Sequence, residues 1–265
     1  MTTTRVRDRI ASTQQPAPRL PQQGLAASVV LHLLPGAAMT TFILLAAPWL
    51  ENRGVPGVVA LFLGIGLVIA PLELGYLAWY ARRTTGSWSP LRAVTYLTPL
   101  PRRRVMRLAV GLAIWFIGLL LVSAAVLDGW LTDTVFGWMP ATLTELASVD
   151  SGGATLSGPA LAVTVVAVFI LNGFVGPITE ELYFRGHLLP RLDRYGKAAP
   201  VLNTVLFSLY HFWTPWQNVA RILGFLPTAW ITWRTRSIYV SLAAHVLTNI
   251  IFVVLLVTLV IGASS

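Results

Sequence analysis

The sequence predicts an all-α fold, a polytopic transmembrane bundle of about seven or eight helices. Apolar residues make up 55% of the 265 residues and charged residues only 11%. The mean hydropathy of +0.71 is well above that of a soluble globular domain. The apolar residues are also gathered into runs of roughly the 20 residues that a helix needs to cross a bilayer. The chain therefore has room for one membrane domain and little else.

Seven apolar runs follow a polar segment that contains Pro, Gln and Arg. We interpret residues 1–23 as a disordered cytoplasmic tail and residues 24–265 as the membrane domain. Each run is long enough, or nearly long enough, to cross a bilayer as a helix, and the fifth and sixth are the shortest. The runs lie at about 25–50, 56–80, 107–127, 159–178, 198–213, 219–233 and 238–262.

The basic residues collect in alternate loops between these runs. Lysine and arginine favour the cytoplasmic side of a membrane, which predicts a multi-pass protein of the cell membrane with its N-terminus in the cytoplasm and its C-terminus outside. The residues that support this orientation are Arg5, Arg7, Arg9, Arg19, Arg82, Arg83, Arg92, Arg102, Arg103, Arg104, Arg185, Arg191, Arg194, Lys197, Arg234 and Arg236.

The loop from Asp128 to Gly158 has the opposite character, with acidic residues and no basic residue. It also contains Trp130, Trp138 and other large apolar residues, which predict an amphipathic segment on the membrane surface. The net charge of +9 does not indicate nucleic-acid binding, because the basic residues stand in short clusters between apolar runs. Without cysteine the chain forms no disulfide and has no thiolate chemistry.

Few polar groups fall within or at the edge of the predicted membrane helices. Ionisable groups at this depth are costly and normally face a water-filled cavity or one another, so they are functional candidates by default. They are His32, Glu73, Asn172, Glu180, Glu181, Arg185, His187, His211, His245 and Asn249. We assign no role to His32 and Glu73, and we interpret His187 as an interfacial residue that reaches toward the lipid headgroups.

The spacing of the remaining candidates separates their roles. Glu181 and Arg185 are four residues apart and pair on one helix face, whereas Glu180 points about 100° away and is free. His245 and Asn249 likewise share one face of the last helix. By linear count His211 lies near the far end of its helix, so convergence on one cavity in the cytoplasmic half requires that helix to tilt or break.

Taken singly, a membrane histidine is often an interhelical hydrogen-bond donor and a Glu–Arg pair a neutralised anchor. Together these residues supply a base, a polarising group and oxyanion donors. The segments EELYFR, FSLYH and HVLTN also fit the patterns E-E-x-x-x-R, F-x-x-x-H and H-x-x-x-N in this order. The chain therefore resembles the CPBP family of CAAX proteases and bacteriocin-processing intramembrane endopeptidases, over about residues 161–262.

The resemblance implies a role for each motif residue. Glu180 would be the general base that activates a water molecule, and His211 would hold and polarise that water. His245 and Asn249 would stabilise the oxyanion, while Glu181 and its arginine partner brace the first motif. A membrane-attached protein or peptide is the implied substrate, and the lipid bilayer is the other partner.

A metal cofactor is left open by the residues. Glu180, His211 and His245 could bind a divalent metal such as zinc and leave an open water position. There is no H-E-x-x-H pair, however, and a base glutamate used as a ligand could not also take the proton. We favour the metal-free glutamate mechanism.

Two other classes of function fit parts of the sequence. A transporter would also bury Glu, His and Arg, but we find no duplicated pattern of spans. A non-catalytic membrane scaffold or bacteriocin-immunity protein could keep the motifs and would tolerate loss of Glu180. The short loops and the absence of cysteine are typical of a bacterial protein.

Overall fold

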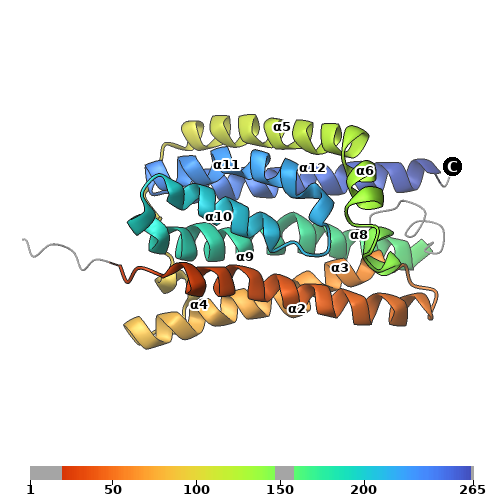
Figure 1. Ribbon diagram of the computed structural model, residues 1–265, viewed down its shortest axis with the longest axis horizontal. Coiled ribbons are helices and arrows are strands. Elements are labelled where there is room, and N and C mark those ends of the chain that lie inside the picture. The colour runs from red at the N-terminus through yellow and green to blue at the C-terminus, as the bar shows by residue number, and fades with distance from the viewer. Residues whose placement is uncertain (1–19, 147–157, 264–265) are drawn as a thin grey trace, which may run out of the picture.

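The computed structural model describes residues 20–146 and 158–263. The predicted tail lies almost wholly outside the described residues, as does the end of the predicted outer loop. Within the described ranges the regular structure is helical apart from one isolated bridge between Leu97 and Ser237. The helices run side by side along the long axis of the molecule (Figure 1). The predicted all-α membrane bundle is confirmed.

Each predicted apolar run contains a helix. The first run forms α2 (Leu25–Glu51). The second forms α3 (Val58–Gly64), η1 (Ile65–Ile69) and α4 (Ala70–Thr85) in succession, and the third forms α5 (Arg102–Val126). The fourth run continues without interruption as α8 (Gly158–Ile170), η4 (Leu171–Val175), α9 (Gly176–Glu180), η5 (Glu181–Leu188) and η6 (Leu189–Tyr195). The last three form α10 (Ala198–Leu209), α11 (Asn218–Thr235) and α12 (Tyr239–Ala263). Short helices in the connections are η2 (Pro90–Ala93), α6 (Asp128–Thr134), α7 (Ala141–Thr144) and η7 (Pro215–Gln217).

Four of the described stretches are long and apolar enough to cross a membrane, namely Leu25–Glu51, Val58–Thr85, Arg102–Val126 and Gly158–Tyr195. Their outward faces carry large apolar side chains that are about two-thirds exposed, such as Ile114 and Val163. A soluble monomer rarely exposes such faces, whereas lipid tails solvate them. The chain is a multi-pass membrane protein.

The arginine-rich connections meet at one end of the bundle, on the left in Figure 1. The carboxylate of Asp193 accepts hydrogen bonds from the Tyr96 hydroxyl at 2.9 Å and from the Trp233 indole at 2.8 Å, and it pairs with Arg236. The Thr98 amide donates to the carbonyl of Arg236 at 3.0 Å. These bonds tie the connections of α4, η6 and α11 together and close this end of the bundle.

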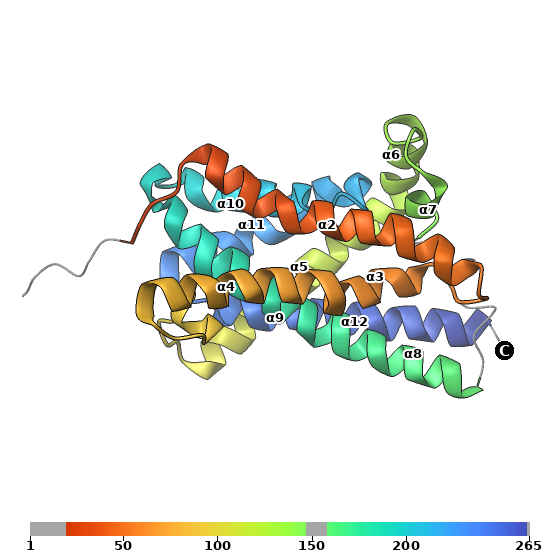
Figure 2. The ribbon, with the colours of Figure 1, turned by 90° about the horizontal axis from the view of Figure 1, so that it is seen from below.

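The opposite end carries α6 and α7, which project from the bundle in Figure 2. The predicted amphipathic segment is therefore helical in its described part. Trp130 and Trp138 are 59% and 79% exposed there, a position in which an indole ring suits a membrane interface. Contact of this segment with a membrane surface stays a prediction.

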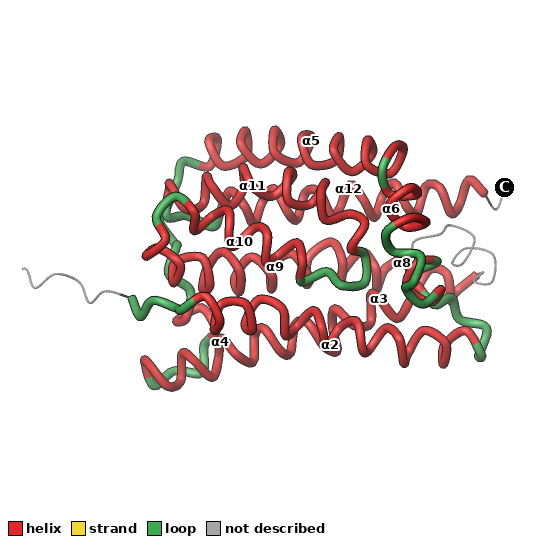
Figure 3. The backbone as a smooth tube through the Cα atoms, viewed as in Figure 1, coloured by secondary structure: helices red, strands yellow, loops and turns green. Residues whose placement is uncertain are grey.

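The α10 helix is shorter than the predicted run. It ends at Leu209, and the chain turns through residues 210–217 before α11 begins. Its 12 residues rise roughly 18 Å, little more than half of the ~30 Å hydrocarbon core. Pro215 disfavours helix at Thr214 and has no N–H to donate, so α10 and α11 cannot form one continuous helix. The turn consequently lies inside the bundle and not at its end (Figure 3).

Close packing of α2 fixes the position of this turn. A Cβ atom added to Gly36 would stand 1.9 Å from the carbonyl oxygen of Tyr210, so only glycine allows the two backbones to approach this closely. Asn203 of α10 donates to the carbonyl of Phe184 at 3.0 Å and lies 3.0 Å from Nε2 of His32. The end of α10 is therefore held between α2 and η5.

Candidate active site

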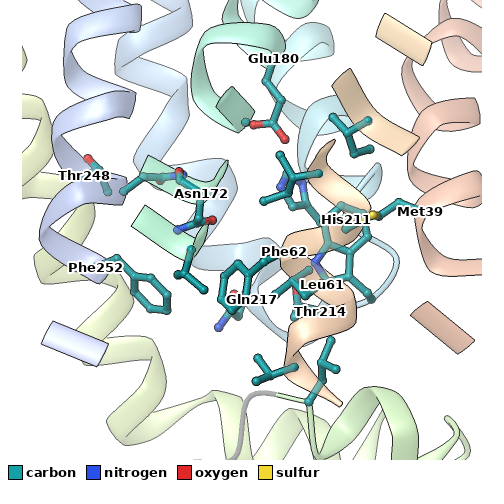
Figure 4. Close-up of a pocket in the computed structure, with 18 of the residues that line it drawn as sticks. Met39, Leu61, Phe62, Asn172, Glu180, His211, Thr214, Gln217, Thr248 and Phe252 are labelled. Atoms are coloured by element: carbon teal, nitrogen blue, oxygen red, sulfur yellow. The ribbon is translucent and has the colours of Figure 1, made fainter. Parts of the chain in front are cut away.

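A cavity of about 310 Å³ lies next to the turn that follows α10. The motif residues Glu180, His211, His245 and Asn249 all line it, although they come from different parts of the chain. Figure 4 shows Glu180 and His211 facing this space, with Asn172 and Thr248 on another wall. The structure thus brings together the four residues that the motifs single out. The break after α10 is what places His211 at the depth of Glu180.

Glu180 ends α9 and is 9% exposed. Its Oε1 accepts a hydrogen bond from the Tyr210 hydroxyl at 3.0 Å. Its Oε2 lies 3.7 Å from Nε2 of His245. One carboxylate oxygen is therefore fixed by a strong donor, and the other remains available on the side of the cavity.

Glu181, the next residue, is fully buried and points to different partners. Its Oε1 lies 3.0 Å from Nδ1 of His245 and 3.6 Å from Nη1 of Arg185. The predicted pair of Glu181 and Arg185 is confirmed. The guanidinium of Arg185 also stacks on the Phe207 ring, 3.9 Å from its centroid. Glu181 thus contacts both the Arg185 guanidinium and the His245 ring.

Hydrogen bonds set the protonation of the two motif histidines. Nδ1 of His211 lies 2.9 Å from the carbonyl oxygen of Phe207, which can only accept, so Nδ1 carries the proton. Nε2 of a neutral His211 is then an acceptor at the cavity. Nδ1 of His245 faces the Glu181 carboxylate and carries a proton for the same reason.

Asn249 is oriented by an irregular turn in a neighbouring helix. Its side-chain amide donates to the carbonyl oxygen of Asn172 at 2.8 Å. Asn172 belongs to η4, a π-helical turn, and such turns are frequent at functional sites. This bond uses one N–H of the amide and leaves the other as a donor.

Three polar candidates lie apart from these residues. His187 is fully buried and its Nδ1 donates to the carbonyl of Ala93 at 2.9 Å, so the interfacial position predicted for it is wrong. Tyr76 and Tyr80 pack edge-on against its ring and exclude it from the headgroup region. His32 contacts the side-chain amide of Asn203 and so joins α2 to α10. Glu73 is also buried, and neither carboxylate oxygen has a hydrogen-bond partner in the described part of the chain.

Sequence reasoning missed two residues of the cavity. Tyr210 occupies an unspecified position of the FSLYH motif, and only the fold shows that its hydroxyl reaches Glu180. Arg221 lies within the sixth apolar run and lines the cavity, yet it was absent from the predicted set of membrane polar groups. A charged residue inside an apolar run is a signal that could have found it.

The cavity extends away from the arginine-rich end. Its far wall includes Val58 of α3, Leu161 of α8, Val257 of α12, and Leu146. The start of α8, the C-terminal end of α12 and the helix α3 lie toward the end of the bundle where α6 and α7 lie (Figures 1 and 2). The cavity therefore continues beyond the half that carries the arginines, and an opening in the cytoplasmic half stays a prediction. The cavity extends this far because of the early end of α10, which leaves the other half of the bundle unfilled.

The arrangement does not fit a metal site. No group of three or more His, Asp or Glu side chains in the described ranges is placed to hold a metal ion. Glu180 and His245 instead face each other and the partners given above. We assign no step to a metal.

These features define an integral membrane protein whose helix bundle buries a carboxylate and histidine site of the kind that hydrolases use. Residues 162–251 match the family model described as type II CAAX prenyl endopeptidase Rce1-like. All the motif residues fall inside this range, so the resemblance to the CAAX protease family is confirmed over this part of the chain. The match supports an intramembrane endopeptidase in general terms. No curated protein and no solved structure matches the chain.

Proposed function

We propose that the protein hydrolyses a peptide bond of a membrane-attached protein or peptide, with Glu180 as the base that activates water. One observation carries the proposal: a single cavity is lined by Glu180, His211, His245 and Asn249. Peptide hydrolysis needs a deprotonated water and preorganised donors where negative charge develops, and this set offers both.

Water activation falls to Glu180 and His211. The Tyr210 hydroxyl occupies Oε1 of Glu180, so Oε2 is the oxygen that takes a proton from water. Nε2 of His211 accepts the second hydrogen bond of that water, because its Nδ1 proton is committed to the Phe207 carbonyl. The water is thereby oriented with a lone pair toward the substrate carbonyl.

Stabilisation of the oxyanion falls to His245 and Asn249. Nδ1 of His245 is held by Glu181, so Nε2 donates only when the ring is a doubly protonated imidazolium. Both carboxylates lie beside the ring, with Oε2 of Glu180 3.7 Å from Nε2 and Oε1 of Glu181 3.0 Å from Nδ1. The free N–H of Asn249 is the second donor.

We further propose that the arginine-rich end faces the cytoplasm, with the N-terminus inside and the C-terminus outside. Support comes from the clustering of basic connections at one end of the bundle and from their scarcity at the other. On this orientation the cavity extends toward the outer half of the membrane.

The test is cleavage of a membrane-tethered peptide reporter by purified variants in detergent. Glu180→Gln is expected to abolish cleavage with the fold intact, because the amide keeps the shape but cannot accept the proton of water. Asn249→Ala is expected to lower kcat by about 10²–10³, the usual effect of losing one oxyanion donor. Comparison of membrane peptide termini from cells with the wild-type protein and with Glu180→Ala supplies the substrate for the reporter.

Glu51→Gln is the matched control, since it makes the same chemical change at an exposed position outside the cavity. Each variant is first checked for monodispersity. Cleavage by Glu180→Gln at the wild-type rate would contradict the mechanism and would favour the scaffold or immunity alternative, which tolerates loss of this residue.

A further inference from the structure

Arg221 is a buried cation in the cavity wall that the mechanism above does not use. It lies in the first turn of α11 and is 5% exposed. It lines the same cavity as Glu180 and His211. A charged side chain in such a place is costly unless a partner compensates it.

The bonding partners of Arg221 within the described chain are all neutral. Nη1 donates to Oδ1 of Asn218 at 2.9 Å, and Nη2 donates to Oγ1 of Thr214 at 2.9 Å and to Oε1 of Gln217 at 3.1 Å. No carboxylate of the described residues lies within ion-pair distance of it. Arg185, the buried arginine of the first motif, differs because Glu181 pairs with it.

Charge of both signs surrounds Arg221, and the carboxylates of Glu180 and Asp128 act on it from beyond ion-pair distance. The first turn of a helix carries the positive end of the helix dipole, and Arg221 stands in that turn of the 18-residue α11. The same turn of the chain connects it to the catalytic set, because the Thr214 amide donates to the carbonyl of His211 at 3.0 Å. Figure 4 shows Thr214 and Gln217 beyond His211 on the side away from Glu180.

We propose that Arg221, braced by Thr214, Gln217 and Asn218, is a binding site for a carboxylate of the peptide substrate. This inference rests on the proposed peptidase function. A carboxylate at Arg221 would supply the direct ion-pair partner that this guanidinium lacks among the described residues, and it would fix the register of the peptide relative to Glu180. The walls around it are apolar, so the rest of the bound segment is apolar as well. The carboxylate comes from the C-terminus of the peptide or from an acidic side chain.

The experiment measures binding, so that it does not depend on turnover. A fluorescein-labelled peptide of ten Ala, Leu and Val residues is made with a free C-terminal carboxylate or an amide, each with or without one internal Glu. Fluorescence anisotropy gives the Kd of each version for Glu180→Gln protein in detergent. The same series is run with Arg221→Gln and Arg221→Lys added.

Arg191→Gln is the matched control, because Arg191 is 3% exposed and bonded to the carbonyl of His187 but does not line the cavity. Thermal melting of all variants reports any structural loss. A purely structural role of Arg221 would lower the melting temperature without changing the preference among the peptides.

We expect at least one carboxylate-bearing peptide to bind about 10- to 100-fold more tightly than the amide without Glu, as a buried charge-assisted bond provides. The peptide version that binds more tightly shows whether the carboxylate comes from the C-terminus or from an acidic side chain. Arg221→Gln should abolish the preference, Arg221→Lys should keep part of it, and Arg191→Gln should leave it intact.

Equal affinity for all versions, absence of binding, or a preference that survives Arg221→Gln would overturn the inference. So would displacement of every peptide alike by phosphatidylglycerol, since Arg221 would then hold a lipid phosphate. These outcomes are separate from the fate of the peptidase proposal, which depends on cleavage by the wild-type protein and its loss in Glu180→Gln.

Discussion

The Tyr210 hydroxyl donates a hydrogen bond of 3.0 Å to Oε1 of Glu180, and both groups are buried. A hydrogen bond to an ionised carboxylate in a low-dielectric site is stronger than one between neutral groups. This bond therefore stabilises the charged form of Glu180 and fixes the rotation of its carboxylate. It leaves Oε2 as the oxygen that can face a water molecule.

Tyr210→Phe is expected to lower kcat of reporter cleavage by about 10- to 100-fold with little change in KM, since a hydrogen bond to a charged group contributes about 1.5–3 kcal/mol. Steady-state kinetics of the purified variant check this. Tyr183→Phe is the control: the Tyr183 hydroxyl is bonded to the Leu31 carbonyl at 2.8 Å and does not line the cavity. It should lower thermal stability but not kcat, and an unchanged kcat in Tyr210→Phe would remove Tyr210 from the site.

At the scale of elements, the site depends on departures from regular helix. η4 presents the Asn172 carbonyl to Asn249, and η5 begins immediately after Glu180. Because α10 ends inside the bundle, His211 lies at the depth of the Glu180 carboxylate. The close contact of Gly36 with Tyr210 then fixes where that end lies.

Gly36→Ala should destabilise the protein by about 1–3 kcal/mol, the usual cost of overpacking a core. It should also reduce activity, because α2 must move away from the Tyr210 carbonyl, which a Cβ would approach to 1.9 Å. Thermal unfolding in detergent and the cleavage rate measure the two effects. Gly75→Ala has open space around the new Cβ and should be neutral or slightly stabilising. Equal behaviour of the two variants would disprove the contact.

Hydropathy predicted the helices well because each apolar run marks a segment that lipid or the interior of the bundle surrounds. It could not predict η4 or η5, because a π-helical turn changes the hydrogen-bond register and leaves the apolar pattern unaltered. Motif spacing identified His211, but linear counting could not place it, since its depth depends on the turn before Pro215. Tyr210 required the fold, whereas Arg221 was visible in its apolar run.

At the scale of the whole molecule, the basic connections lie at one end of the bundle and the cavity extends toward the other end. The end with the basic connections is closed by the bonds of Asp193, Tyr96, Trp233 and Arg236. The cavity wall continues toward the other end, past Leu161 and Val257. The side from which a peptide enters is therefore decided by the orientation of the bundle in the membrane.

Reporters fused near Trp138 and near Lys197 test that orientation. We expect an alkaline phosphatase reporter to be active only near Trp138 and a fluorescent protein to be bright only near Lys197, because basic connections stay in the cytoplasm. Equal signals at both positions would mean that the stretch Gly158–Tyr195 does not cross the membrane. Reversed signals would place the cavity toward the cytoplasm.

The shortness of α10 also bears on how the chain is made. A helix of 12 residues is too short to span a bilayer alone. The buried Arg221 likewise makes insertion of α11 alone unfavourable. We therefore expect the two segments to enter the membrane together, with α2 and η5 already in place to receive Asn203. His245 arrives still later, with α12. A nascent chain consequently has no complete set of motif residues until α12 is inserted, so the proposed peptidase would be inactive during its own synthesis.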